Sequence, residues 1–204
     1  MQKKKNKSIR KVRYVLYKET LVDLQEHFWT FIGSFFGIGL IAFTQSHSLD
    51  RLENIFLIGS FGASSVLIYG AIQSPLAQPR NLVGGHVISA FIGVCIYKLI
   101  PNPDLIWVSA PLAVSFSIIA MQMTKTLHPP GGATALIAVI GTPKVKALGF
   151  MYVISPVLSG VLILLLVAII ANNLTKNRQY PTNSRLTKYI KPRKIRLRDV
   201  TKRH

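Results

Sequence analysis

Long apolar segments alternate with short polar ones along most of the chain. Five of them are long enough to cross the ~30 Å hydrocarbon core of a bilayer as helices, and they cover residues 28–44, 55–72, 82–100, 105–123 and 147–171. A sixth segment, 131–142, offers only about two-thirds of a spanning length. This pattern predicts an all-α membrane protein with about six transmembrane helices.

The sixth segment begins with residues that break helices. Its lead, from Thr126 to Gly132, reads Thr-Leu-His-Pro-Pro-Gly-Gly. Two consecutive prolines remove two backbone donors, and the glycines loosen the chain. Irregular backbone at membrane depth usually lines a cavity, because each unsatisfied group costs several kcal/mol in hydrocarbon. The break is therefore a candidate functional site, and a sixth crossing requires the extended lead to be part of it.

The chain also matches itself at an offset of 70 residues. Residues 61–67 (FGASSVL) align with 131–137 (GGATALI), and 87–90 (VISA) align with 157–160 (VLSG) without a gap. Small residues recur by chance in membrane spans, but the shared register favours a duplication. Three crossings per half would make the second copy enter from the opposite side. The sequence then predicts a 3+3 inverted repeat with broken helices at Gly62 and Gly132.

The formal charge of +18 lies mainly at the two ends of the chain. This distribution argues against a general nucleic-acid binder and favours a membrane protein with both termini in the cytoplasm. Three regions follow: a basic cytoplasmic N-terminal segment (1–26), a transmembrane domain (27–175) and a basic cytoplasmic tail (176–204). Six crossings place Arg80 and Lys125 inside and Pro143 outside. Four crossings plus two re-entrant hairpins would also put both termini inside.

If the repeat is real, the two Gly-Ala-Ser/Thr stretches begin helices whose N-termini point toward the membrane midplane. Free amides and a hydroxyl there would bind an anion without a buried cation. Arg80 would attract anions at a pore mouth, or simply mark the cytoplasmic side. His86 and His128 would act as ligands or proton relays, or satisfy neighbouring carbonyls. The predicted substrate-binding residues are Gly62, Ala63, Ser64, Gln78, Arg80, Asn81, His86, His128, Gly131, Gly132, Ala133 and Thr134.

Little in the sequence supports catalysis. It contains no nucleophile elbow, phosphate loop or paired carboxylate within the apolar region. The histidines are scattered and Cys95 is the single cysteine, so no metal site is expected. We therefore expect a protein that is not an enzyme and that needs no cofactor.

The stretch from His128 to Thr134 resembles the signature of the HPP family of integral membrane proteins. Residues 59–64, 74–81 and 84–86 are similar to other characteristic stretches of that family, and the resemblance covers roughly Phe28 to Pro181. The family is usually described as having four membrane segments, fewer than the six expected here. Members from plant chloroplasts and cyanobacteria are associated with nitrite transport, so the resemblance implies nitrite as a substrate to consider.

Together these interpretations predict a multi-pass transporter or channel for a small monovalent anion, with nitrite as the best guess, in the cell (inner) membrane. Its partners would be the anion, the lipid bilayer and anionic lipids at the basic ends, with room for a homo-oligomer and no specific nucleic acid. One alternative is a non-transporting membrane anchor whose basic tail binds lipid, RNA or a protein. Another is a channel for a small neutral solute.

Overall fold

The computed structural model describes residues 24–46, 59–174 and 178–182, and these form helices and turns with no strand among them. The all-α prediction is confirmed. The helices are α2 (Leu24–Ser46), a helix over 59–70 that ends in η1 (Val66–Gly70), η2 (Pro75–Ala77), α4 (Pro79–Leu99), η3 (Pro103–Leu105), α5 (Ile106–Met123), α6 (Pro129–Ile140), α7 (Pro143–Ala147), η4 (Val153–Leu158) and α8 (Ser159–Ala171).

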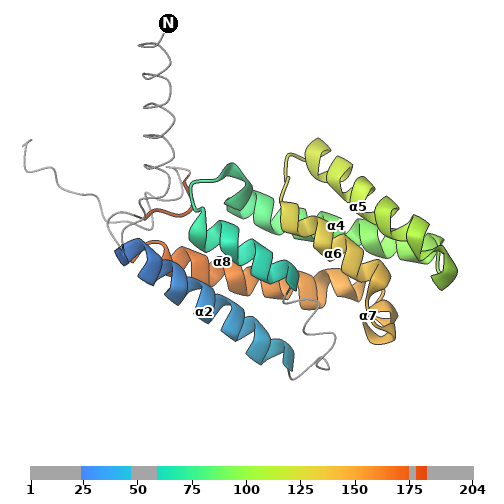
Figure 1. Ribbon diagram of the computed structural model, residues 1–204, viewed down its shortest axis with the longest axis horizontal. Helices are drawn as coiled ribbons and strands as arrows, with labels where there is room; N and C mark the ends of the chain where they lie inside the picture. Colours follow the sequence, from blue (N-terminus) through green and yellow to red (C-terminus); the bar gives the residue numbers. More distant parts are fainter. Residues whose placement is uncertain (1–23, 47–58, 175–177, 183–204) are drawn as a thin grey trace, which may run out of the picture.

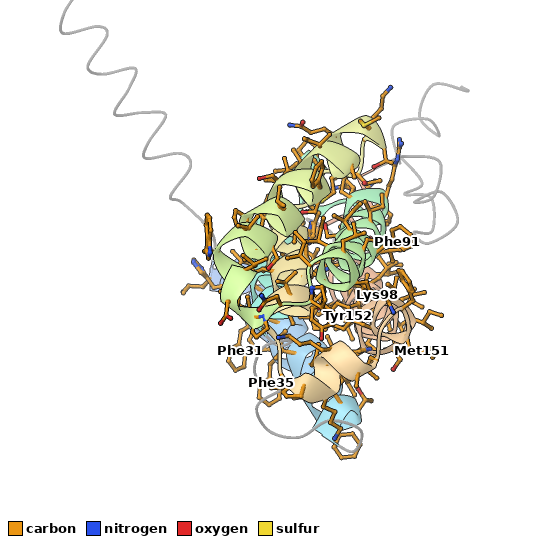
Figure 2. The ribbon with its side chains drawn as sticks, turned by 90° about the vertical axis from the view of Figure 1, so that its right-hand side faces the viewer. Phe31, Phe35, Phe91, Lys98, Met151 and Tyr152 are labelled. Atoms are coloured by element: carbon orange, nitrogen blue, oxygen red, sulfur yellow. The ribbon has the colours of Figure 1, made fainter. Side chains whose placement is uncertain are left out.

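Four of these helices are long and apolar enough to cross a membrane within the described part of the chain. They are Leu24–Gln45, Pro79–Leu99, Pro103–Met123 and Val153–Ala171. Large apolar side chains cover their outer faces, as expected of surfaces in contact with lipid. Figure 2 shows Phe31 and Phe35 projecting from α2, where both side chains are exposed.

The two remaining apolar helices are short, and they run in opposite directions. The helix over 59–70 is antiparallel to α2, because Tyr69 contacts Thr30 near the start of α2 whereas Phe61 and Gln45 meet at Gly160. In contrast, α6 runs parallel to α4: Gly131 lies against Gly85, and Gly93 lies against Ala135. Both short helices begin near the middle of the molecule and run outward (Figure 1). The predicted opposite orientation of the two broken helices is thus present.

The breaks themselves lie earlier in the chain than predicted. We expected the helices to begin at Gly62 and Gly132, but Gly59 is already helical and α6 begins at Pro129. Proline favours the first turn of a helix, where its missing amide hydrogen costs nothing and its φ is already suitable. Residues 124–128 lead non-helically from the end of α5 to this start. This lead and α6 together carry the chain to the other face.

The helices form two groups that resemble each other. α2, the 59–70 helix and α8 pack together, as do α5, α6 and α4 (Figure 1). Burial also repeats along the short helices, because each residue from 59 to 65 has the same burial class as the residue 70 positions later. Contacts repeat as well: Gly131 lies against Ser89, and the equivalent Phe61 lies against Gly160. These correspondences are what a duplicated three-helix unit would produce.

We call two opposite faces of the molecule the Arg80 face and the Lys146 face. The Arg80 face contains the start of α2, residues 71–80 and 124–127, and residues 172–174 and 178–182 after α8. The Lys146 face contains the end of α2, residues 100–105 and residues 141–150. Arg80 and Lys125 therefore lie on one face and Pro143 on the other, as the predicted topology requires.

Arg178 joins the end of the chain to the helix core. Its side chain is only 2% exposed and donates to the carbonyl of Tyr69, the side chain of Asn172 (2.9 Å) and the carbonyl of Glu26 (2.9 Å). Burial lowers the pKa of Arg178, whereas the nearby Glu26 carboxylate raises it. Residues 178–182 therefore pack against the helices, and the predicted domain boundaries stay predictions. The remaining predicted tail, 183–204, lies outside the described residues.

Candidate functional site

A cluster of four fully buried polar side chains lies where the two short helices meet α4. Ser64 comes from the 59–70 helix, His86 from α4, His128 from the residue before α6, and Thr134 from α6 itself; each is 0% exposed. We call these four residues the histidine cluster. Burying four polar groups is costly unless they are hydrogen-bonded to one another.

Short hydrogen bonds connect the whole histidine cluster. Ser64 Oγ lies 2.7 Å from His86 Nε2 and 2.9 Å from His128 Nε2. His86 Nδ1 lies 2.7 Å from Thr134 Oγ1, and His128 Nδ1 lies 2.9 Å from the carbonyl oxygen of Leu76. The result is one continuous path from Thr134 in α6 to the loop on the Arg80 face.

The carbonyl at one end sets the direction of every bond in this path. A carbonyl only accepts, so Nδ1 of His128 carries its proton and, in the neutral ring, Nε2 accepts from the Ser64 hydroxyl. Ser64 Oγ then accepts from Nε2–H of His86, whose Nδ1 accepts from the hydroxyl of Thr134. Every donor points toward Leu76, and both rings are neutral in this arrangement.

Ser64 has a second acceptor for its hydroxyl proton. Its Oγ lies 3.1 Å from the carbonyl oxygen of Ser60, one turn earlier in the same helix. If His128 gains a proton at Nε2, the Ser64 hydroxyl can turn to Ser60 and accept from both imidazoles. The histidine cluster can therefore hold one additional proton without leaving any of its donors unpaired.

Other side chains surround the histidine cluster closely. The ring of Phe61 lies 5.4 Å from that of His86, centroid to centroid, and the hydroxyl of Tyr152 donates to the carbonyl of Thr134 (3.0 Å). Ser89 Oγ is buried beside Gly131 and has no hydrogen-bond partner. No group of three metal-ligating side chains occurs among residues 24–46, 59–174 and 178–182.

The structure brings together only some of the predicted site residues. Ser64, His86, His128 and Thr134 meet, and Gly131 packs beside them against Ser89 and Gly85. Ala63 and Ala133 are exposed on the outer sides of their helices. Gly62 lines a separate pocket against α2, and Gly132 faces Val114 of α5. Ser and Thr face inward, so the glycine and alanine before them cannot face the same way on a helix.

Gln78, Arg80 and Asn81 lie on the Arg80 face and hold its loops together. Gln78 donates to the carbonyls of Ile72 and Ser74 (both 3.0 Å). Arg80 is exposed and donates to the carbonyl of Thr124 (2.7 Å). Asn81 donates to the carbonyl of Leu127 (2.8 Å), the residue directly before His128. These residues position the lead into α6, and the hydrogen bonds described for them do not include the four clustered side chains.

Sequence reasoning did not identify Tyr152, Leu76 or Arg178 as parts of this architecture. Tyr152 is hidden in an apolar run, and Leu76 contributes only its backbone carbonyl. Arg178 looked like one more cation of a basic tail. No local signal separates these residues from their neighbours, because apart from Asn172, which binds Arg178, their partners named above lie 18 to 152 positions away along the chain.

Comparison with known proteins agrees with this architecture. The family model described as "HPP, transmembrane region" matches residues 19–181. Two proteins of Dictyostelium discoideum, each described as a transmembrane protein, are 48% and 47% identical to the chain over 160 residues. Each match covers 78% of this chain, and 51% and 56% of the respective relatives, so the chain spans about half their length. No solved structure matches the chain.

Proposed function

The chain belongs to the HPP transmembrane family, and from that premise we propose that it is a multi-pass transporter or channel for a small monovalent anion, with nitrite as the first substrate to test. The histidine cluster carries this proposal. It brings four polar side chains together inside an apolar helix bundle, at the meeting point of two oppositely directed short helices. Such meeting points are where transporters with inverted repeats hold their substrates.

Ser64 marks the place where an anion would bind. Both Nε2 atoms converge on its hydroxyl oxygen, at 2.7 and 2.9 Å. An anion oxygen bound beside this hydroxyl would accept from it, from His86 and, once His128 is protonated, from both rings. Each hydrogen bond to a charged group contributes about 1.5–3 kcal/mol. The proton on His128 would also offset the charge of the anion in a medium of low dielectric constant.

This site differs from the helix N-terminus that the sequence suggested. Pro129 and Pro130 occupy the first two positions of α6 and have no amide hydrogens. The amide of Gly131 already donates to the carbonyl of His128 (2.8 Å). The start of α6 therefore offers an anion few free donors, and the imidazoles are the better candidates.

Flux into proteoliposomes containing the full chain tests this proposal. We expect uptake of nitrite, with nitrate, formate and chloride as comparison anions. Thr134→Val and Ser64→Ala should weaken the apparent affinity by roughly tenfold or more, since each removes a hydrogen-bonding group from the histidine cluster. Thr124→Val is the matched control, because Thr124 lies exposed at the end of α5. Equal transport by all variants would place the substrate path elsewhere.

A channel for a small neutral solute is the second candidate. One observation favours it: none of the side chains that form the histidine cluster is a carboxylate, lysine or arginine. Ammonia or urea flux without nitrite flux would support this candidate. No flux of any of these solutes would favour the membrane anchor.

We also propose that the Arg80 face is cytoplasmic, in the cell (inner) membrane, with anionic lipids bound at the basic ends and with no enzymatic activity. The excess of Lys and Arg on the two flanks supports this orientation. In a Cys95→Ser background, an impermeant thiol reagent should label Lys144→Cys from outside and Lys125→Cys only after permeabilisation. The reverse pattern would invert the orientation, and labelling of both positions from outside would refute the proposed arrangement of crossings.

A further inference from the structure

A pocket of about 290 Å³ lies between the end of α2 and the start of the last helix, near the Lys146 face. Its polar lining comes from Thr44, Gln45, Ser155 and Ser159. Gln45 is 6% exposed and forms a buried part of the wall, whereas the other three side chains are exposed. None of these residues belongs to the histidine cluster.

Hydrogen bonds already engage the donors of three of these side chains. The hydroxyl of Thr44 donates to the carbonyls of Leu40 (2.8 Å) and Ile41 (3.1 Å), within its own helix. The hydroxyl of Ser159 donates to the carbonyl of Pro156 (3.2 Å). Gln45 Nε2 donates to the same carbonyl (3.3 Å), which fixes the amide orientation because reversal would set two acceptors against each other. Each side chain therefore offers oxygen lone pairs to the pocket.

Gln45 Oε1 is the second observation that points to a ligand. This oxygen is buried and has no hydrogen-bond partner among the residues that the structure describes, and a buried acceptor without a partner costs about 1–3 kcal/mol. The backbone beside it is unwound: Ser155 departs from helical geometry (φ −133°, ψ 121°), and Pro156 lacks an amide hydrogen. Unwound backbone next to side-chain oxygens is an arrangement with which membrane transporters bind small cations.

We propose that this pocket is a binding site for a small monovalent cation, coordinated by neutral oxygens that include Gln45 Oε1, Thr44 Oγ1 and Ser159 Oγ. Oxygen ligands suit hard cations and ammonium, and the committed hydroxyls of Thr44 and Ser159 with the amide oxygen of Gln45 offer an anion no donor, which leaves the Ser155 hydroxyl as the one side-chain donor among the described lining residues. Neutral ligands suit a single positive charge better than a double one, since nothing in the pocket lining compensates a second charge.

Nearby cations do not occupy this pocket. The ammonium group of Lys146 lies over the ring of Tyr97 (5.3 Å), and that of Lys98 lies over the ring of Phe150 (5.5 Å). Neither lysine lines the pocket. Lys144, the third described lysine of this face, does not line it either, so no described cation occupies the pocket.

A single aromatic side chain connects this pocket to the histidine cluster. A Cβ on Gly160 would lie 3.1 Å from Gln45 Nε2 and 2.7 Å from the ring of Phe61, so both side chains meet at this glycine. The ring of Phe61 also lies 5.4 Å from the ring of His86, centroid to centroid. A cation bound at Gln45 would thus favour one position of Phe61 and couple to the histidine cluster. This coupling role rests on the proposed transport function, whereas cation binding does not.

Thermal unfolding of the purified full chain in detergent tests cation binding without any transport assay. Sodium, potassium and ammonium chloride are titrated against N-methylglucamine chloride at constant total chloride. A cation that binds only the folded state raises the unfolding temperature with its concentration. We expect such a rise for at least one of the three small cations and none for N-methylglucamine. Equal curves for all four salts would overturn the site.

Variants then locate the site. Thr44→Val should raise the half-saturating concentration of the stabilising cation by about tenfold, as expected for one lost interaction with a charged group. Thr124→Val is the control, since Thr124 bonds to its own helix in the same way, at 2.7 and 3.3 Å, and otherwise only to the hydroxyl of Thr126 (2.7 Å), on the opposite face. Equal shifts in both variants would overturn the assignment to this pocket.

Nitrite flux with and without the stabilising cation tests the coupling. Flux that requires the cation, and that loses this requirement in Thr44→Val, supports a coupled site. If the cation binds but nitrite flux is the same with and without it, the coupling role is overturned. If the protein transports no anion, the anion proposal fails while the unfolding measurements still decide whether the cation site exists.

Discussion

At the scale of single residues, Ser64 is the hydroxyl on which the architecture depends most. Its oxygen accepts from the imidazole of His86 and its hydroxyl donates to the imidazole of His128, so it joins the two halves of the molecule. Thr134 occupies the equivalent place in the second half but contacts only one histidine. Both hydroxyls can also bond to the carbonyl four residues earlier, at 3.1 and 3.4 Å. The equivalent residues are thus similar in setting but unequal in role.

Ser64→Ala should destabilise the protein by about 1–3 kcal/mol, because the Nε2 atoms of His86 and His128 would lose their shared partner in a buried site. Ser34→Ala is the control, since Ser34 lies on α2 and bonds only to carbonyls of its own helix (2.9 and 3.1 Å). Thermal unfolding in detergent compares the two variants. Equal unfolding temperatures would mean that the hydroxyl does not hold the two histidines in place.

At the scale of elements, the contact between α4 and α6 sets the position of the site. A Cβ added to Gly131 would lie 2.8 Å from Ser89 Oγ and 2.9 Å from the carbonyl oxygen of Gly85, which is too close. Further along, Gly93 packs against the backbone of Ala135. Small residues of this kind let membrane helices approach closely. Because of this approach, His86 on α4 reaches Thr134 on α6.

Gly131→Ala should therefore cost about 1–3 kcal/mol through overpacking, with the two helices forced apart. Gly132→Ala is a matched control one position away, since its Cβ would meet only Val114 at 3.8 Å. Unfolding temperature reports the cost, and nitrite flux reports whether His86 and Thr134 still meet. A Gly132→Ala variant as damaged as Gly131→Ala would show that helix propensity rather than packing matters here.

At the scale of the whole molecule, the segment after α8 closes the Arg80 face. Arg178 donates to the carbonyl of Tyr69 at the C-terminal end of the 59–70 helix, where a positive charge suits the helix dipole. It also binds Glu26 near the start of α2, through an ion pair of 3.3 Å. Tyr180 donates its hydroxyl to the carbonyl of Ala77 (2.7 Å), and burial raises its pKa, so this hydroxyl stays protonated.

Arg178→Ala should destabilise the protein by about 1–3 kcal/mol, because the buried oxygens of Tyr69 and Asn172 lose their donor. Deleting residues 183–204 from the chain should change the unfolding temperature far less, since the described contacts of this segment end at Thr182. The deletion should also weaken binding to vesicles that contain anionic lipid, by about 1 kcal/mol for each cation near the surface. If the deletion lowered the unfolding temperature strongly and Arg178→Ala left it unchanged, the stabilising contacts would lie in residues 183–204 and not at Arg178.

The sequence by itself determined the helical class, the apolar segments, the break at His128 and the 70-residue correspondence between Ser64 and Thr134. These features depend on local composition and spacing, which hydrocarbon constrains strongly. Only the tertiary structure decided which side of each short helix faces inward, and so separated Ser64 and Thr134 from their glycine and alanine neighbours. It also placed Arg178 in the core and gave Ser64 two histidine partners, 22 and 64 positions away. Such contacts depend on helix rotation and on distant backbone carbonyls, which the local sequence does not specify.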